Sequence, residues 1–285
     1  MQLVKELHKE ADSVSQCCRL FGVKRNSYYK SKRSTKPFDT ALILKVKACF
    51  RQHKQRYGRR RLKVALLTEY AIDISSRRLG RLMKEQQLIT VWQGRKYRRV
   101  KQSPECAAYP NRLDRQFTCG RANSAWVSDI TYIWTQEGWL YLAAVMDLYS
   151  RKIIGFAMGN SPNADLVCRA LQMTISIRQP PTGLMIHSDQ GCQYTSKVYK
   201  ALVEKYQLTG SMSRRGNCWD NAVMERFFRS LKQELVWQHG YRTRQEAQQS
   251  ISGYILDVYN SNRLHSTLNY LSPNAFEGNK KAETI

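Results

Sequence analysis

The pattern of apolar and polar positions divides the 285-residue chain into a half with helical periodicity and a half that opens with strands. Near the N-terminus, apolar side chains recur at the i, i+3, i+4, i+7 spacing of one helix face: Val14, Cys17, Cys18 and Phe21. Gly22 is expected to end this helix, and a second helix is expected to begin near Lys24. Residues 1–36 are therefore predicted to form a helix-turn-helix module.

A second helical block is predicted over residues 37–94. It contains the amphipathic run "ALILKVKACFRQ", a break at Gly58 and a further helix with Ser75 or Ser76 as its N-cap. Leu79, Leu82 and Met83 lie on one face of that last helix. Gly80 inside it costs about 1 kcal/mol relative to alanine. Residues 95–120 are basic, contain proline and lack periodicity, so we expect a linker.

From Ala125 the pattern changes to strands. "AWVSDITYIW", "LYLAAVMDLYS" and "KIIGFAM" predict an antiparallel meander, followed by a helix in "NADLVCRALQMTISIR". "LMIH" predicts a short buried strand, and "SKVYKALVEKY" another helix. This order predicts an α/β fold, a mixed sheet covered by helices, with a core over residues 121–240 and a completing C-terminal segment over 241–285.

Composition is typical of a globular protein, with 42% hydrophobic and 24% charged residues. No apolar run approaches the roughly 20 residues needed to cross a bilayer, and the N-terminus lacks the apolar stretch of a signal peptide. The eight cysteines form no C-x-x-C pair, which argues against a zinc ribbon or a disulfide framework. We therefore expect a cytoplasmic protein without a membrane partner.

Charge points to a polyanionic partner. The net charge is +25, and residues 1–120 hold 29 basic and 9 acidic side chains, against 18 and 13 in residues 121–285. A basic N-terminal half fits nucleic-acid binding. The side chains predicted to contact DNA are Lys24, Arg25, Asn26, Tyr28, Arg59, Arg60, Arg61, Arg77, Arg78, Arg81, Arg95, Lys96, Arg98, Arg99, Arg214, Arg215, Arg229 and Lys232.

Three carboxylates stand in places that suggest chemistry. Asp129 lies in the middle of the first strand, where an unpaired acid is costly. Asp189 ends the "LMIH" strand, and Glu225 follows a helix start for which Asp220 or Asn221 is the expected N-cap. If the two strands are neighbours, Asp129 and Asp189 meet at one edge of the sheet.

Three acids fit a site for Mg²⁺ or Mn²⁺, which prefer oxygen ligands. Two such ions about 3.5–4 Å apart can hold the attacking and leaving oxygens of a phosphoryl displacement. Asp129 is expected to bridge both ions, with Asp189 and Glu225 each completing one. His187 is a candidate for orienting a ligand or the attacking water, although a satisfied strand-end histidine is the favoured interpretation.

Four further residues are expected to have structural rather than catalytic roles. Asp147 is expected to be a turn acid at a strand end, and Trp219 to pack in the core, with stacking on an extruded base as its alternative. Arg263 and His265 receive no role beyond packing or backbone contact.

The acids and their surroundings resemble a known family. Asp129, "HSDQG" with Asp189 and "DNAVMERFF" with Glu225, separated by 35 residues from Asp189, are similar to the DDE signature of the retroviral-integrase superfamily. More narrowly, the chain resembles insertion-sequence transposases of the IS-three family, OrfB type. "GVKRNSYY", "YGRRRLKVAL", "SSRRLGRLMKE" and "YNSNRLHSTLNYLSPNAFE" resemble other segments of that family.

The resemblance implies a ribonuclease-H-like core and dependence on divalent metal. It implies that water cuts one strand at an element end and that the freed 3′-hydroxyl attacks a second phosphodiester. The partners it implies are terminal inverted repeats, target DNA, further copies of the chain on DNA and an upstream-frame OrfA protein or fusion, in a bacterial cytoplasm.

Two other functions stay open at this point. One is a sequence-specific DNA-binding regulator with an inactive core, and the other is a structure-specific nuclease such as a junction resolvase. A metal-dependent nicking assay separates the regulator from the transposase, and a joined product separates the nuclease from it.

Overall fold

The computed structural model describes residues 14–20, 22, 24, 38–90, 108–214 and 218–282. The chain forms two compact units, Met1–Cys49 and Phe50–Ile285. In the first, helix α2 (Val14–Leu20) is followed by Gly22 with φ +62°, a left-handed conformation that ends helices. The predicted stop at Gly22 is thus confirmed. The second helix expected near Lys24 lies almost entirely outside the described residues.

Helix α4 (Thr40–Gln52) leads to two helices of the second unit, α5 (Arg59–Tyr70) and α6 (Ser76–Glu85). The Ser75 hydroxyl accepts a hydrogen bond from the Arg78 amide, which confirms the predicted N-cap. The apolar face predicted for α6 is also confirmed, because its buried residues are Leu79, Leu82 and Met83. A Cβ at Gly80 would lie 2.9 Å from Cδ of Arg59, an exposed side chain that can move aside.

A five-stranded sheet in the order β3-β2-β1-β4-β5 forms the centre of the second unit. The meander is confirmed: β1 (Ala125–Thr135), β2 (Gly138–Asp147) and β3 (Ile153–Gly159) are antiparallel neighbours. The short strand β4 (Met185–Ser188) pairs in parallel with β1. Strand β5 (Thr209–Met212), which the pattern did not predict, pairs in parallel with β4.

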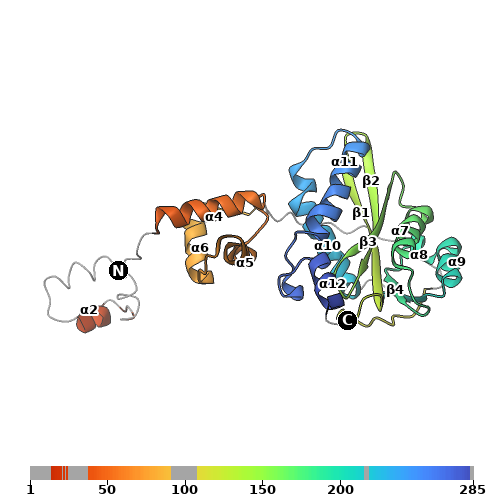
Figure 1. The fold of residues 1–285 in the computed structure, drawn as a ribbon, viewed down its shortest axis with the longest axis horizontal. Coiled ribbons are helices and arrows are strands. Elements are labelled where there is room, and N and C mark those ends of the chain that lie inside the picture. Colours follow the sequence, from red (N-terminus) through yellow and green to blue (C-terminus); the bar gives the residue numbers. More distant parts are fainter. Residues whose placement is uncertain are drawn as a thin grey trace. The chain divides into compact units, whose positions relative to one another are not determined.

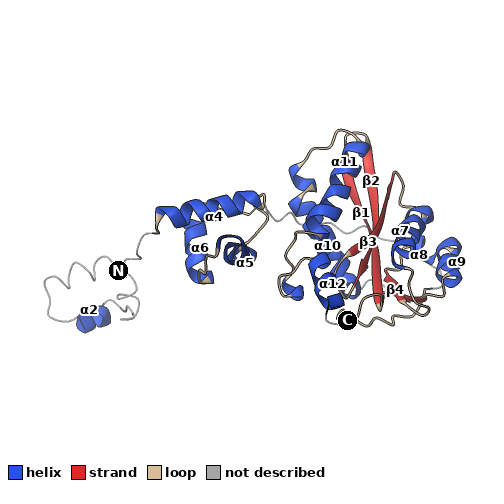
Figure 2. Ribbon diagram, viewed as in Figure 1, coloured by secondary structure: helices blue, strands red, loops and turns tan. Residues whose placement is uncertain are grey.

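Helices cover both faces of the sheet (Figure 1). One layer holds α7 (Ala164–Arg178), the short α8 (Cys192–Thr195) and α9 (Lys197–Lys205). The other holds α10 (Ala222–Glu234), α11 (Arg244–Gly253) and α12 (Pro273–Ala282). Figure 2 shows the strands lying between these two helical layers. Shorter helical turns are η1 (Cys218–Asn221), η2 (Val236–Gln238), η3 (Tyr254–Asn260) and η4 (Ser266–Leu268).

Two hydrophobic cores lie on opposite sides of the sheet because side chains of a strand alternate between its faces. Ala125, Val127 and Ile133 of β1 join the core under α10 and α11. Trp126 of the same strand joins the core under α7 and α9. Three antiparallel strands followed by two parallel ones, with helices on both faces, match the expected α/β, ribonuclease-H-like core. Within the described residues, no helix is both long and apolar enough to span a membrane.

Candidate active site and nucleic-acid surface

Asp129 and Asp189 come from neighbouring strands. The parallel register of β1 and β4 pairs Val127 with His187, so the next residues on that side are Asp129 and Asp189, two positions further along each chain. The expectation that the strand preceding Asp189 lies beside the strand of Asp129 is confirmed. Both carboxylates therefore stand at the place where β4 ends and β1 continues.

A tight turn fixes the Asp189 side chain. Its Oδ1 atom accepts a hydrogen bond from the amide of Gly191 at 3.0 Å. A Cβ at position 191 would lie 2.9 Å from that same oxygen, closer than a side chain tolerates. The glycine of "HSDQG" thus leaves room for the Asp189 carboxylate beside the backbone, although the contacting side-chain end could shift.

Glu225 lies in the first turn of α10, which packs across β1. Burial raises the pKa of Asp129 well above its ordinary value, and the negative charges of Asp189 and Glu225 raise it further. The amide of Ile130 and the charge of Lys232 act in the opposite direction. Asp189 and Glu225 therefore each lie close enough to Asp129 to interact with it electrostatically.

The turn before α10 is anchored by Asp220, whose side chain is fully buried. Its carboxylate accepts hydrogen bonds from Arg214 Nε at 3.1 Å, from Arg115 Nε at 2.8 Å and from Asn111 Nδ2 at 3.1 Å. The hydrogen bond from Arg214, together with that from Arg115, holds the pKa of this carboxyl well below its usual range. Of the two predicted N-cap residues, Asp220 is therefore not the cap, because Arg115 and Arg214 from two separate segments of the chain use its oxygens.

Asn221 occupies the N-cap position of α10 but does not cap it with its side chain. Its Nδ2 atom donates instead to the carbonyl oxygen of Ser128, the residue before Asp129, at 3.3 Å. Its Oδ1 atom is buried and has no hydrogen-bond partner among the described residues. A buried acceptor near Asp129, together with the carboxylates of Asp129, Asp189 and Glu225, offers oxygen donors only, which fits Mg²⁺ or Mn²⁺.

His187 is fully buried, and both of its ring nitrogens are already engaged. Nδ1 lies 2.9 Å from the Ser211 hydroxyl and Nε2 lies 3.1 Å from the Ser213 hydroxyl. Burial lowers the pKa of His187 to about 4. These contacts fit the satisfied strand-end histidine and leave neither ring nitrogen to orient a metal ligand.

Apart from Lys232, the predicted DNA contacts fall into three groups. The exposed side chains are Lys24, Arg59, Arg60, Arg77, Arg78 and Arg229. Three arginines have acidic partners instead, Arg61 with Glu234, Arg81 with Glu85 and Arg214 with Asp220. The predictions that lie outside the described residues are Arg25, Asn26, Tyr28, Arg95, Lys96, Arg98, Arg99 and Arg215.

Lys232 is partly buried seven residues after Glu225, and burial lowers its pKa. Its Nζ atom lies 4.5 Å from the centre of the Tyr132 ring. Its charge also acts on Asp129. This lysine is therefore a neighbour of the acids as well as a candidate DNA contact.

A buried ionic network around Glu234 was missed by the sequence analysis. Arg263 donates to both carboxylate oxygens at 2.8 to 3.0 Å, and Tyr254 donates at 2.8 Å. Arg61 at the start of α5 lies 3.7 Å from Glu234 Oε1, and Arg56 Nε donates to the Glu234 carbonyl oxygen. The network thus ties the α5 region to the end of α10. The only sequence signal is an acid in the mostly apolar stretch "LKQELVW".

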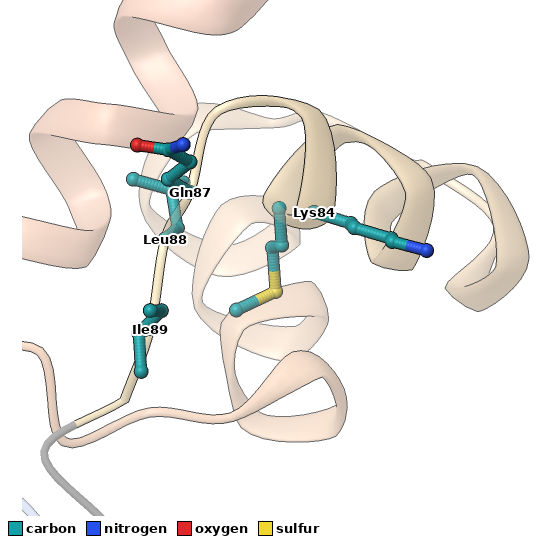
Figure 3. Close-up of a pocket in the computed structure, with 5 residues that line it drawn as sticks. Lys84, Gln87, Leu88 and Ile89 are labelled. Carbon is teal, nitrogen blue, oxygen red and sulfur yellow. The ribbon is translucent and has the colours of Figure 1, made fainter.

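Two surface hollows involve the segment of helices α5 and α6. Figure 3 shows the first, at the end of α6, lined by Lys84, Gln87, Leu88 and Ile89 together with Met83. The second lies at the start of α5 and is lined by Gly58, Arg59, Arg60, Arg61, Gly80, Met83, Ser266 and Tyr270. The second is cationic and suits phosphate groups.

The remaining residues singled out in the sequence are now placed. Asp147 ends β2 and accepts from the amides of Asn123 and Tyr149, which confirms a turn acid. Trp219 is 69% exposed, so its predicted core packing is wrong. Arg263 is buried against Glu234, and His265 is buried with its ring edge-on to Tyr259.

Comparisons with known proteins match nearly the whole chain. Models described as "Integrase core domain" match residues 120–218 and 206–273, and one described as "HTH-like domain" matches residues 37–96. The chain is 40% identical to the insertion element IS600 uncharacterized 31 kDa protein of Shigella sonnei, over 91% of this chain and 96% of that one. It is 39% identical to the IS904 transposase of Lactococcus lactis, over 82% and 92%.

It is also 36% identical to transposase InsF for insertion sequence IS3A of Escherichia coli, over 97% and 98% of the two chains. Among solved structures, the HTLV-2 integrase catalytic core domain in complex with magnesium is 15% identical and covers 54% of this chain and 96% of its own, with a TM-score of 0.44. An intasome of simian T-cell lymphotropic virus is 12% identical, covers 82% and 74%, and has a TM-score of 0.47.

Proposed function

Because this chain belongs to the IS3 family of insertion-sequence transposases, we propose that Asp129, Asp189 and Glu225 together form its catalytic site for cutting and joining DNA. The observation that carries this proposal is the electrostatic interaction of Asp189 and Glu225 with Asp129. Three carboxylates, two of which act on the third electrostatically, offer the oxygen ligands that a divalent cation prefers.

The enzyme is a DDE polynucleotidyl transferase. In its first step a water oxygen bonds to the phosphorus at an element end, and the bond to the 3′-oxygen of the neighbouring nucleotide breaks. In its second step that freed 3′-hydroxyl bonds to the phosphorus of another phosphodiester, and the bond from this phosphorus to the 3′-oxygen of the adjoining nucleotide breaks. The hydroxyl protons leave to solvent or to the departing oxygens. A regulator with an inactive core and a junction resolvase both lose support, because the relatives are transposases along almost their full length.

The integrase core implies dependence on divalent metal, and we propose two Mg²⁺ or Mn²⁺ ions for each site. When bound, such ions activate the attacking oxygen and stabilise charge on the leaving oxygen. Asp129, Asp189 and Glu225 are the acids that would hold these ions, and we propose that Asp129 would contact both. The buried Oδ1 of Asn221 is a further oxygen for one ion or for its water.

The DNA substrates that we propose are the terminal inverted repeats of the element and its target. The exposed arginines of α5 and α6 and the cationic hollow at the start of α5 support a grip on the phosphate backbone. Assembly of several copies on DNA, action in the bacterial cytoplasm and help from an OrfA protein or fusion are parts of the same proposal.

The decisive experiment substitutes each acid conservatively, as Asp129→Asn, Asp189→Asn and Glu225→Gln. With labelled element ends and Mg²⁺, we expect each variant to lose both nicked and joined products while gel mobility shifts stay within about twofold of wild type, because DNA is held by other residues. Calorimetric titration with Mn²⁺ should show weaker metal binding in each variant.

The matched control is Asp165→Asn, which removes an exposed acid that pairs with Arg169 on α7. This control should cut and join like wild type. Joined product from any of the three acid variants at more than a few per cent of wild type contradicts the proposed site.

A further inference from the structure

An aromatic strip lies exposed on the β1–β2 hairpin beyond the catalytic acids. We define the strip as Tyr132, Trp134 and Trp139. Trp134 and Trp139 are direct partners in the antiparallel register and are 59% and 43% exposed. Their rings meet edge-on at 4.9 Å, and Tyr132 meets Trp139 at 5.1 Å with planes at 89°. The three rings thus hold one another in fixed orientations on a rigid ribbon.

Contact of the tryptophan rings with water is unfavourable in free energy, and a ligand that covers the rings removes this cost. Two neighbouring tryptophans leave a large apolar area in water, and such contiguous patches mark binding sites. Apolar packing does not require them, because the core beneath the hairpin is filled by Ile133, Leu140 and Leu142. The strip therefore presents aromatic faces to something outside the described residues.

The strip and Asp129 lie on the same strand but on opposite faces of the sheet. Tyr132 is three residues after Asp129 on β1, about 10 Å along the strand, and this odd spacing directs its side chain to the other face. Lys232 connects the two, since its ammonium lies over the Tyr132 ring and its charge acts on Asp129. Strand β1 pairs with β4 through Val127, and the strip begins five residues further on. A DNA strand held at the acids would therefore reach the strip round the edge of β1, beyond its pairing with β4.

A second cation borders the far end of the strip. Arg244 Nε donates to the carbonyl oxygen of Trp139 at 3.2 Å, and the Arg244 amide donates to Glu137. Its guanidinium lies so near the turn that a Cβ at Gly138 would be 3.1 Å from Nη2. In Figure 1, α11, which begins with Arg244, lies beside this end of β2.

Aromatic faces between two cations match the chemistry of a nucleic-acid strand. Bases stack on the rings and phosphates meet the cations, and such stacking tolerates any base because every base has a π-face. A second copy of this chain fits less well, because a symmetric contact would bring Lys232 and Arg244 towards like charges in a chain of net charge +25.

We infer that the aromatic strip binds unpaired nucleobases at the DNA end that is being cut, within a few nucleotides of the scissile phosphate. The inference rests on the proposed function, since it takes the acids to mark the scissile phosphate. Stacking compensates for base pairs opened near the cleavage point, so the strip assists the reaction by holding an opened end in place.

The test combines a stacking probe with cleavage. 2-Aminopurine, whose fluorescence is quenched by stacking, replaces each of the last several bases of a labelled element end in turn, and binding is followed with EDTA present. We expect wild type to quench the probe at one or more positions, and Trp134→Ala and Trp139→Ala to lose that quenching. In Mg²⁺, cleavage of a fully paired end should fall roughly tenfold or more in these variants. An end with pre-opened terminal pairs should recover part of that loss.

Two variants sharpen the test. Trp134→Phe keeps an aromatic face and should retain most of the quenching and cleavage. Trp237→Ala removes a tryptophan of η2 that is 46% exposed and lies outside the strip, and should behave as wild type.

Unchanged quenching and cleavage in both alanine variants overturns the inference. The inference is also overturned if the alanine variants keep the quenching but differ from wild type in the molar mass measured by light scattering. The strip would then be a contact between copies of the chain. If the wild-type protein does not cut the end, the proposed function is wrong. If wild type cuts the end and both strip variants cut it equally well, only the inference about the strip is wrong.

Discussion

At the scale of single residues, consecutive arginines at the start of α5 differ in what they contact. Both line the cationic hollow, but Arg60 is exposed, whereas Arg61 is partly buried against Glu234. Burial lowers the pKa of Arg61, and the charge of Arg263 adds to this effect, while Glu234 opposes it. The sequence cannot distinguish the two side chains, because their partners come from the other end of the unit.

We expect Arg60→Gln to weaken DNA binding and to reduce the slope of log K against log salt concentration by about 0.9, the value for one lost phosphate contact. Fluorescence anisotropy on an element end from 50 to 200 mM NaCl measures this slope. In Arg61→Gln the slope should stay as in wild type, and the free energy of unfolding should fall by about 1–3 kcal/mol because Glu234 loses a partner. A reduced slope in Arg61→Gln would show that this arginine contacts DNA.

His265 should make stability depend on pH. Burial lowers its pKa to about 2 from an ordinary 6.5, and the charge of Arg263 contributes to this shift. The unfolded chain therefore takes up the proton first, so this contribution to stability is complete above pH 6.5 and is lost as the pH falls below that value. Urea unfolding should show a decline of about 1.4 kcal/mol per pH unit from this residue between pH 6 and 5.

His265→Leu should remove that part of the pH dependence, since leucine does not titrate. The exposed His239 supplies the comparison variant, His239→Gln, which should keep the wild-type profile. Identical slopes for His265→Leu and wild type would mean that His265 does not control stability in this range.

At the scale of elements, helix α7 lies against β3 at Gly155 with no room for a side chain. A Cβ there would lie 2.2 Å from Oγ1 of Thr174 and 2.7 Å from the carbonyl oxygen of Ala170. Because the second of these is helix backbone, relief requires the helix and the sheet to separate. This contact sets how closely α7 covers the sheet.

Gly155→Ala should therefore lower the free energy of unfolding by about 1–3 kcal/mol, the usual cost of overpacking a core. Thermal and urea unfolding measure the loss. Gly120→Ala is the matched control, because a Cβ at that exposed position meets nothing within 4 Å. A Gly155→Ala protein as stable as the control would contradict the tight α7–β3 contact.

The elements also show what the sequence could and could not predict. The alternation in β1 to β3 and the apolar face of α6 are local patterns, and they gave the right elements. Strand β5 has four residues, "TGSM", and is a strand because it pairs with β4 and because the Tyr109 ring packs where a Cβ of Gly210 would stand. Asp220 was misassigned for the same reason, since Asn111 and Arg115 reach it from more than a hundred residues away.

At the scale of the whole molecule, most of the positive charge expected to bind DNA and the acids expected to carry out the chemistry lie in different halves of the sequence. Of the net charge of +25, residues 1–120 contribute +20, whereas the candidate catalytic acids all lie beyond residue 120. We therefore expect EDTA to abolish cutting and joining while DNA binding stays within about twofold, measured in parallel on the same element end. Raising NaCl from 50 to 200 mM should weaken binding by roughly a thousandfold with or without EDTA.

Loss of DNA binding in EDTA, at constant ionic strength, would contradict this separation. It would mean that metal at the acids, rather than the basic half, holds the DNA.

The Glu234 network has a consequence for chimeric transposases. Helix α10 bears Glu225 in its first turn and Glu234 at its last residue, so one rod about 13 Å long joins a candidate catalytic acid to the partner of Arg61. A chimera that carries the α5–α6 segment of another insertion element's transposase on this core needs an arginine at position 61. Without it, Glu234 must be substituted as well. Exchange of end specificity between insertion elements is thus constrained by the ion pair of Arg61 with Glu234.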